Sequence, residues 1–114
     1  MSGLDLKWGE VSGVAWISLD GSLDTLTSEK LEQLLFQLMK RGIVKIVVNF
    51  EKLQYISSSG IGVLVGNCNE IREKGGDLKF AALPTRIKRA FQMVSLLDLF
   101  EVYDSLGDAI SSFK

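Results

Sequence analysis

Apolar and polar positions alternate along the first quarter of the chain in a pattern typical of β-strands. Residues 4–8 alternate with a period of two, residues 14–19 form a short apolar run, and residues 11–13 separate the two segments with a glycine-containing turn. This arrangement predicts two strands joined as a hairpin. The polar segment 20–22 is expected to end the second strand.

Residues 25–41 change to the helical period. We expect Asp24 or Thr25 to supply the N-cap of this helix. The apolar positions recur at i, i+3, i+4 and i+7, the spacing of an amphipathic helix, at Leu31, Leu34, Leu35 and Leu38. The nearly unbroken run 43–50 is rich in β-branched residues and predicts a central strand covered on both faces.

A second helix is predicted after a polar junction. Its buried stripe has helical spacing and comprises Ile61, Leu64, Val65, Cys68 and Ile71. Gly62 and Gly66 lie four residues apart on one face, and each would cost about 1 kcal/mol relative to alanine in a helix interior. We expect a close approach of this helix to the sheet at these two glycines to offset that cost.

The last third of the chain continues the alternation. It predicts a strand at residues 77–82, a helix after Pro84, a strand at residues 100–103 and a closing helix capped by Ser105. The element order is therefore β-β-α-β-α-β-α-β-α. Strands alternating with helices favour a mixed, mostly parallel sheet, and the opening hairpin adds an antiparallel edge. The sequence predicts one α/β domain over residues 1–114.

Composition narrows the classes of function. The chain has 46% hydrophobic and 24% charged residues, as a globular domain does, and its net charge of −1 gives no general attraction for nucleic acid or an anionic membrane. No signal peptide or apolar run of about 20 residues is present, so we expect a cytoplasmic protein. Without histidine, and with Cys68 alone, we expect no metal, no cofactor and no histidine-based catalytic triad.

The chemically distinctive residues gather where the buried strand meets the second helix, at Ser57-Ser58-Ser59-Gly60. A helix N-terminus leaves backbone N–H groups free and favours negative charge, so it suits both a capping hydroxyl and an anion. One serine is enough for a cap. Three serines before a glycine therefore permit a further role.

Two catalytic or cofactor-binding interpretations of this junction fail on spacing. A dinucleotide fingerprint would need its third glycine one position before Gly66, and no acidic residue closes the next strand. A hydrolase nucleophile elbow would need glycine where Ile56 stands, and a histidine to accept the proton. We therefore expect no enzyme. A sensor of a small ligand or nucleotide at the same helix N-terminus remains an alternative.

Two segments resemble a known family. Residues 56–64, Ile-Ser-Ser-Ser-Gly-Ile-Gly-Val-Leu, resemble the D-S-S-G-L/I-G motif of STAS domains, which include the bacterial anti-sigma factor antagonists of the SpoIIAA type. Residues 20–24, Asp-Gly-Ser-Leu-Asp, are similar to the G-x-L/I-D segment before the first helix of that family. The resemblance extends over essentially the whole chain in length and element order.

The resemblance implies a binding protein switched by phosphorylation. Ser58 would be phosphorylated by a partner anti-sigma factor that is also an ATP-using serine kinase, and a PP2C-type phosphatase would reverse the modification. The unphosphorylated form would bind the anti-sigma factor and so free a sigma factor. The resemblance implies that the partner-binding residues are Asp24, Ser57, Ser59, Gly60, Ile61 and Gly62.

One residue departs from the family motif. The family usually has aspartate immediately before the phosphorylated serine, and this chain has Ser57. The change removes a negative charge and makes Ser57 and Ser59 rival acceptors to Ser58. The resemblance also allows a stand-alone STAS module in a stress-signalling complex, or an accessory subunit of a transporter.

Overall fold

The computed structural model describes residues 3–114 and contains the predicted elements in the predicted order. One short 3₁₀ helix, η1, was not predicted. The elements are β1 (Leu4–Val11), β2 (Val14–Leu23), α1 (Ser28–Lys40), β3 (Lys45–Ile56), α2 (Ser58–Glu73), β4 (Asp77–Ala81), α3 (Thr85–Met93), η1 (Leu97–Leu99), β5 (Val102–Tyr103) and α4 (Leu106–Ser111).

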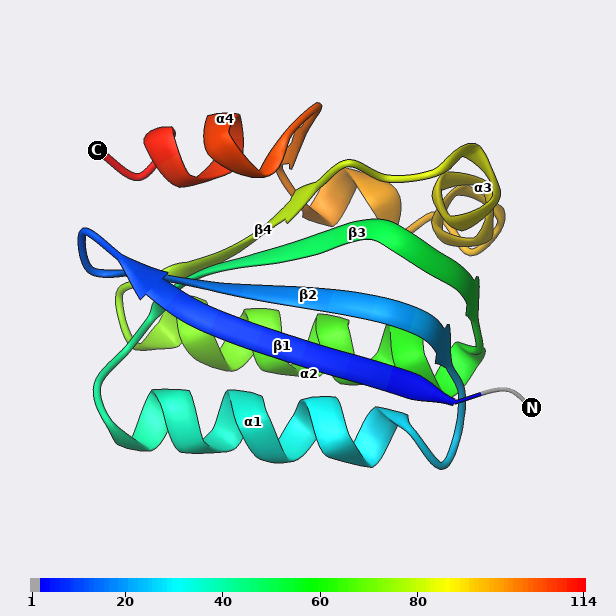
Figure 1. Cartoon of the computed structure of the whole chain (residues 1–114), viewed down its shortest axis with the longest axis horizontal. Helices are drawn as coiled ribbons and strands as arrows, with labels where there is room; N and C mark the ends of the chain where they lie inside the picture. Colours follow the sequence, from blue (N-terminus) through cyan, green and yellow to red (C-terminus); the bar gives the residue numbers. More distant parts are fainter. Residues whose placement is uncertain (1–2) are drawn as a thin grey trace.

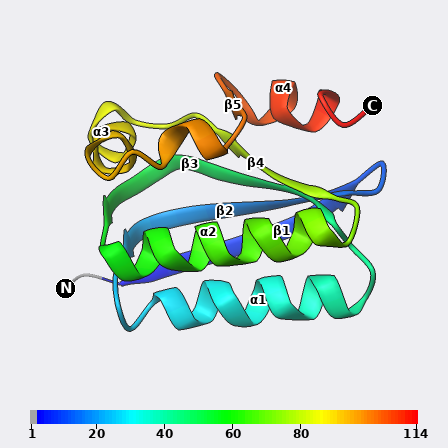
Figure 2. The same cartoon turned by 180° about the vertical axis from the view of Figure 1, so that it is seen from behind.

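The five strands form one sheet in the order β1-β2-β3-β4-β5. β1 and β2 are antiparallel, and every other neighbouring pair is parallel, as predicted. Helices α1 and α2 lie side by side on one face of the sheet, and α4 lies on the opposite face (Figures 1 and 2). The domain is thus a three-layer α/β structure with an antiparallel edge hairpin.

Strands β2 and β3 are longer than predicted. The polar segment 20–22 does not end β2, which runs on to Leu23, and β3 runs on to Ile56. Register shifts between Ser18 and Asp20 and between Gly21 and Ser22 keep the two strands paired through this region. Both strands therefore end together, with Leu23 paired to Ile56, beside the serine junction.

The core fills both sides of the central strand, as the run 43–50 predicted. Ile46, Val47 and Val48 are fully buried in β3. Val47 packs in the cluster under α4, and its two neighbours pack in the main cluster on the other face. Aromatic rings extend that main cluster to α3 and to Phe100 after η1, with the ring centroids of Phe80 and Phe91 5.2 Å apart and those of Phe80 and Phe100 4.0 Å apart. This packing fixes the end of β3 from which the junction leaves.

Candidate functional site

Ser57 is the N-cap of α2. Its backbone is extended (φ −90°, ψ 170°) and its hydroxyl oxygen accepts a hydrogen bond from the Gly60 N–H at 3.2 Å. Its own N–H donates to the Leu23 carbonyl at 2.8 Å, which ties the junction to the end of β2. Ser57 is half-buried, and both its hydroxyl and its backbone N–H take part in hydrogen bonds.

Ser58 and Ser59 are the first two residues of α2, and both are exposed. The Ser59 hydroxyl lies 3.2 Å from the hydroxyl of Thr25, in the turn before α1. Within residues 3–114, the Ser58 hydroxyl has no hydrogen-bond partner. Of the three serines, Ser58 alone presents a hydroxyl to solvent that neither caps the helix nor bridges to another loop.

Asp24 holds the turn that faces the junction. One oxygen of its carboxylate accepts from the N–H groups of Leu26 and Thr27, at 3.0 and 2.9 Å. The Thr27 hydroxyl accepts from the Asp24 N–H at 2.8 Å. The hydrogen bond from the Thr27 N–H is the largest of the effects that hold the pKa of Asp24 below its ordinary value.

Helix α1 is assigned from Ser28, later than predicted, and Thr27 at its assigned N-cap position makes no side-chain capping bond. Asp24 nevertheless has the hydrogen bonds of an N-cap for the turn that leads into the helix, because its carboxylate accepts from the N–H groups of Leu26 and Thr27 and its carbonyl accepts from the Ser28 N–H at 2.9 Å. Thr25 is not the cap, because its hydroxyl lies 3.2 Å from the hydroxyl of Ser59 and bonds to no N–H group of the turn. Residues 24–27 therefore form a turn of their own beside the serine junction.

The close approach of α2 to the sheet occurs at Gly60 and not at the two predicted glycines. A Cβ atom on Gly60 would lie 2.9 Å from Leu23 Cγ and 3.0 Å from Ile56 Cγ1. Gly62 and Gly66 are exposed, and a Cβ on either would meet nothing within 4 Å. The prediction for these two positions was wrong because helical spacing does not show which face of a glycine-containing helix is turned to the sheet.

The expected partner-binding residues divide by exposure. Gly60 and Ile61 are buried and set the position of the helix end, whereas Ser59 and Gly62 are exposed and Asp24 and Ser57 are half-buried. Sequence reasoning missed Leu26, which is 81% exposed at the tip of the Asp24 turn. The pattern Asp24-x-x-Thr27 was the available signal, because such side chains fold a turn back on itself. We call the exposed residues Thr25, Leu26, Ser58, Ser59 and Gly62 the junction surface.

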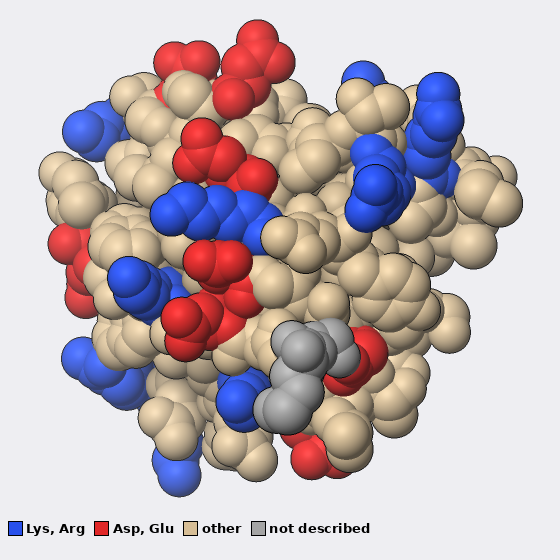
Figure 3. Space-filling model, turned by 45° about the vertical axis from the view of Figure 1, so that its right-hand side comes forward, with Lys and Arg blue, Asp and Glu red and all other residues tan. Residues whose placement is uncertain are grey.

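The surroundings of this end of the molecule carry few charges. The end of β3 and the start of α2 lie at the right of Figure 1, and that side comes forward in Figure 3. Much of the right half of that view is uncharged, with a group of basic side chains in its upper part and a few acidic side chains toward the lower centre. A charge added at the junction would therefore change the local character of the surface.

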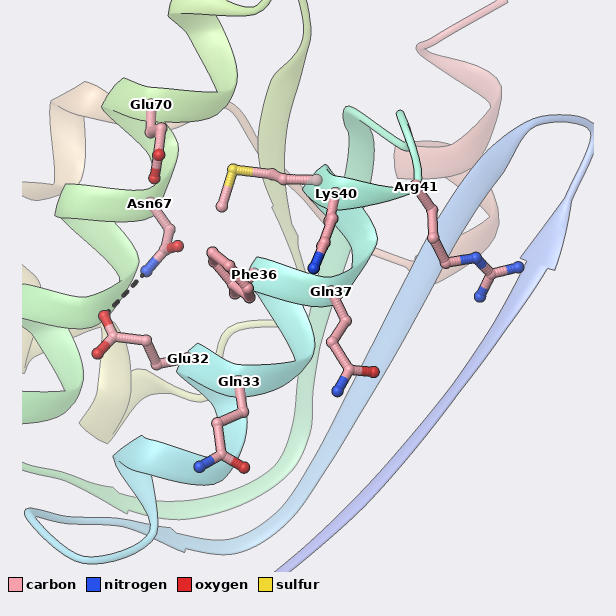
Figure 4. A pocket seen from close by; sticks show the side chains of 9 residues that line it. Glu32, Gln33, Phe36, Gln37, Lys40, Arg41, Asn67 and Glu70 are labelled. Carbon is pink, nitrogen blue, oxygen red and sulfur yellow. Dashed lines mark hydrogen bonds between the residues drawn. The ribbon is translucent and has the colours of Figure 1, made fainter.

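A separate groove runs between α1 and α2, with a volume of about 650 Å³ (Figure 4). Asn67 from α2 points into it and donates to Glu32 at 3.4 Å and to the Val63 carbonyl at 2.7 Å. The exposed ring of Phe36 forms its floor next to Lys40. None of the junction serines lines this groove. Sequence reasoning did not find it, because Asn67 lies on the apolar stripe of α2 without a distinguishing motif.

Among residues 3–114, no group of three or more histidine, cysteine, aspartate or glutamate side chains is placed to hold a metal ion. No helix in the part of the chain that the structure describes is long and apolar enough to cross a membrane.

The fold and the junction define a small α/β domain with a hydroxyl cluster at a strand-to-helix junction. The model of the STAS domain family matches residues 8–109, so the chain belongs to that family. The anti-sigma F factor antagonist of Paenibacillus polymyxa is 28% identical over 112 residues, which cover 97% of this chain and 96% of that protein.

Solved structures show the same fold. An anti-sigma factor antagonist from Mycobacterium paratuberculosis has a TM-score of 0.86 at 20% identity, over 96% of this chain and 93% of that one. The Bacillus cell fate determinant SpoIIAA, solved in its phosphorylated form, has a TM-score of 0.78 at 23% identity, over 96% and 100%.

Proposed function

We propose that this protein is an anti-sigma factor antagonist that binds an anti-sigma factor through the junction surface and is released by phosphorylation of Ser58. The similarity to the Paenibacillus polymyxa antagonist supports the proposal, because it extends over nearly the full length of both chains. The observation that carries it is the position of Ser58, whose exposed hydroxyl has no hydrogen bond among residues 3–114 and stands at the place of the modified serine in the family motif.

The hydrogen bonds of the junction favour Ser58 over its two neighbours as the acceptor. Phosphorylation of Ser57 would place a phosphate on the half-buried hydroxyl that caps α2, and phosphorylation of Ser59 would break its contact with Thr25. The departure at Ser57 is also explained by its role. Aspartate and serine are both good N-caps, so serine preserves the cap of α2 while it removes one negative charge.

The expected effect of the phosphate is local. It would add about −1.5 to −2 charges and three acceptor oxygens at a helix N-terminus, where free N–H groups and the helix dipole favour negative charge. The fold should therefore tolerate it. A protein surface packed over Ser58 and Leu26 would not, because the charge would have to lose its water there. Release then follows from direct blocking of the interface.

This function needs two protein partners and no cofactor of its own. The proposed kinase is the anti-sigma factor itself, which would use ATP, and a PP2C-type phosphatase would restore the binding form. The two loops of the junction surface are joined by the Thr25–Ser59 contact, so we propose that Asp24 contributes by holding the first loop in place.

The proposal is tested by incubating the protein with ATP and an anti-sigma factor kinase from the same organism, followed by mapping of the phosphosite and calorimetric binding. We expect phosphate on Ser58, none in Ser58→Ala, and unchanged stoichiometry in the control Ser59→Ala. Phosphorylated protein should bind the kinase at least about tenfold more weakly, a difference of 1.4 kcal/mol. Equal binding by both forms, or phosphate on Ser57, would contradict the proposal.

A further inference from the structure

β1 forms an open edge of the sheet, and among residues 3–114 its eight residues have no other strand on their outer side. Figure 1 shows it in front of the sheet, with no helix drawn over its outer side. The opposite edge strand, β5, has only two residues. Because long edge strands offer unpaired N–H and C=O groups, they can pair with another chain unless something prevents it.

The hairpin geometry shows which backbone groups of β1 are free. The turn residues Ser12 and Gly13 both have positive φ, 53° and 80°, as in a two-residue hairpin turn. Such a turn makes the flanking pair Val11–Val14 a hydrogen-bonded one, and hydrogen-bonded pairs alternate along an antiparallel ladder. The odd-numbered residues of β1 therefore bond to β2, in agreement with the 2.9 Å bond from Ser22 N–H to the Gly3 carbonyl. The N–H and C=O groups that point to the open edge belong to Leu4, Leu6, Trp8 and Glu10.

The side chains of β1 are complementary, in charge and in apolar surface, to those of β1 in a second copy of the chain. Asp5 and Lys7 are exposed on the face of the sheet that carries α4. Asp5 lies opposite Asp20 of β2, an unfavourable pair of like charges, and within residues 3–114 neither Asp5 nor Lys7 forms a salt bridge. On the other face, Leu6 is half-buried and Trp8 is 40% exposed, so apolar surface reaches the edge of the sheet.

We propose that two copies of this chain pair through β1, antiparallel, about a twofold axis at Leu6. This register places Leu6 beside Leu6 of the second copy, Leu4 beside Trp8, and Asp5 opposite Lys7 twice. The free groups of Leu4, Leu6 and Trp8 then form about six hydrogen bonds between the two chains. A twofold axis closes the assembly as a dimer with one continuous sheet.

Other antiparallel registers are less favourable. A twofold axis at Lys7 would place the two lysines opposite each other, and an axis at Trp8 would leave Asp5 opposite Val11 and Lys7 opposite Gly9. A lysine on an edge strand normally discourages pairing. Here the axis at Leu6 supplies that lysine with an aspartate, and supplies Asp5 with the cation that β2 does not provide. The interface uses no residue of the junction surface, so it is independent of the proposed function.

The test is the oligomeric state by sedimentation velocity, from low micromolar to near-millimolar protein. We expect the wild type to form a dimer as concentration rises. Asp5→Lys and Lys7→Asp should each raise the dissociation constant by about tenfold or more, since each replaces two attractive pairs by two repulsive ones. The double variant Asp5→Lys/Lys7→Asp should restore the dimer, and the exposed control Glu73→Lys should leave it unchanged.

Two further readouts separate pairing from a change in the monomer. Asp5→Lys places a cation opposite Asp20, so its monomer should be at least as stable as the wild type in thermal unfolding while it dimerises less. In hydrogen exchange, the amides of Leu6 and Trp8 should become protected with rising concentration, and those of Asp5 and Lys7 should be protected throughout. A wild type that stays monomeric over the whole range, or a double variant no better than the single ones, would overturn the proposal.

Discussion

At the scale of single residues, Gly60 and Gly62 stand two positions apart in α2 and have opposite surroundings. We predict that Gly60→Ala lowers the free energy of unfolding by about 1–3 kcal/mol, because its Cβ would press on Leu23 and Ile56. Gly62→Ala is the matched control and should raise stability by up to about 1 kcal/mol, since a Cβ there meets open space and alanine favours the helix. Urea unfolding of both variants measures the difference. Equal effects would contradict the close approach at Gly60.

The cap of α2 offers a second prediction at the same scale. Ser57→Ala should lower the free energy of unfolding by about 1 kcal/mol because the Gly60 N–H loses its acceptor. Ser57→Asp should leave stability nearly unchanged, since aspartate caps as well as serine does. Ser58→Ala serves as the control, because the Ser58 hydroxyl bonds to nothing in the described part of the chain. Chemical denaturation of the three variants checks whether the cap and the proposed phosphorylation site are different residues.

The Asp24 turn gives a prediction about pH. Its carboxylate accepts hydrogen bonds that lower its pKa in the folded state, the largest effect coming from the Thr27 N–H. A lowered pKa means that this contribution to stability is complete above the unfolded pKa and is lost as pH falls through the folded value. An NMR titration should show Asp24 ionising below the ordinary range of aspartate. Thr27→Val, which removes the hydroxyl that helps to lower the pKa, should move the value upward, and an unmoved value would contradict this account.

At the scale of elements, the short helix α4 depends on one nearly buried lysine of β4. The Lys79 ammonium donates to the Ser112 hydroxyl at 2.8 Å, lies 3.3 Å from Glu101 and stands 4.1 Å from the centre of the Phe113 ring. We predict that Lys79→Ala destabilises the protein by about 1–3 kcal/mol, because polar groups at the end of α4 lose their partner. The exposed Lys45→Ala should change stability by less than about 0.5 kcal/mol. Differential scanning calorimetry distinguishes the two.

The sequence predicted every long element, and the reasons for its errors are physical. The stripe Leu31 to Leu38 has the helical period, and the run 43–50 is a nearly unbroken series rich in β-branched residues. Such local patterns predict helix and strand directly. The extensions of β2 and β3 depend on pairing between segments about 30 residues apart, with register shifts that no local pattern reveals. The 3₁₀ helix at Leu97–Leu99 is too short to have a period.

The candidate site, too, could be predicted only in part from the sequence. The serine cluster was visible in the sequence because hydroxyls and glycine mark a helix start. The assignment of the cap to Ser57, and the contact of Ser59 with Thr25, required the three-dimensional placement of two loops. The exposure of Leu26 follows from the Asp24 turn and could not be read from its apolar character, which by itself predicts burial.

At the scale of the whole molecule, the reactivity of the Cys68 thiol measures how often the domain unfolds. Cys68 is 2% exposed, and burial raises the pKa of its thiol, so little reactive thiolate reaches solvent in the folded state. We predict that a thiol reagent labels Cys68 at least about a thousandfold more slowly in buffer than in urea, because labelling requires unfolding. The variant Ser58→Cys/Cys68→Ser should react at once with the same reagent. Rapid labelling of the wild type would show that α2 separates from the sheet on its own.

The pairing of Leu23 with Ile56 at the ends of β2 and β3 limits which kinases could use this protein as a substrate. Protein kinases commonly act on extended, flexible segments, but Ser58 stands on the first turn of a helix whose two preceding residues are anchored to a neighbouring strand. A kinase that modifies it must accept a rigid folded surface, and its selectivity must come from shape over both loops rather than from a linear motif. A synthetic peptide of residues 53–64 should then be a far poorer phosphate acceptor than the intact domain.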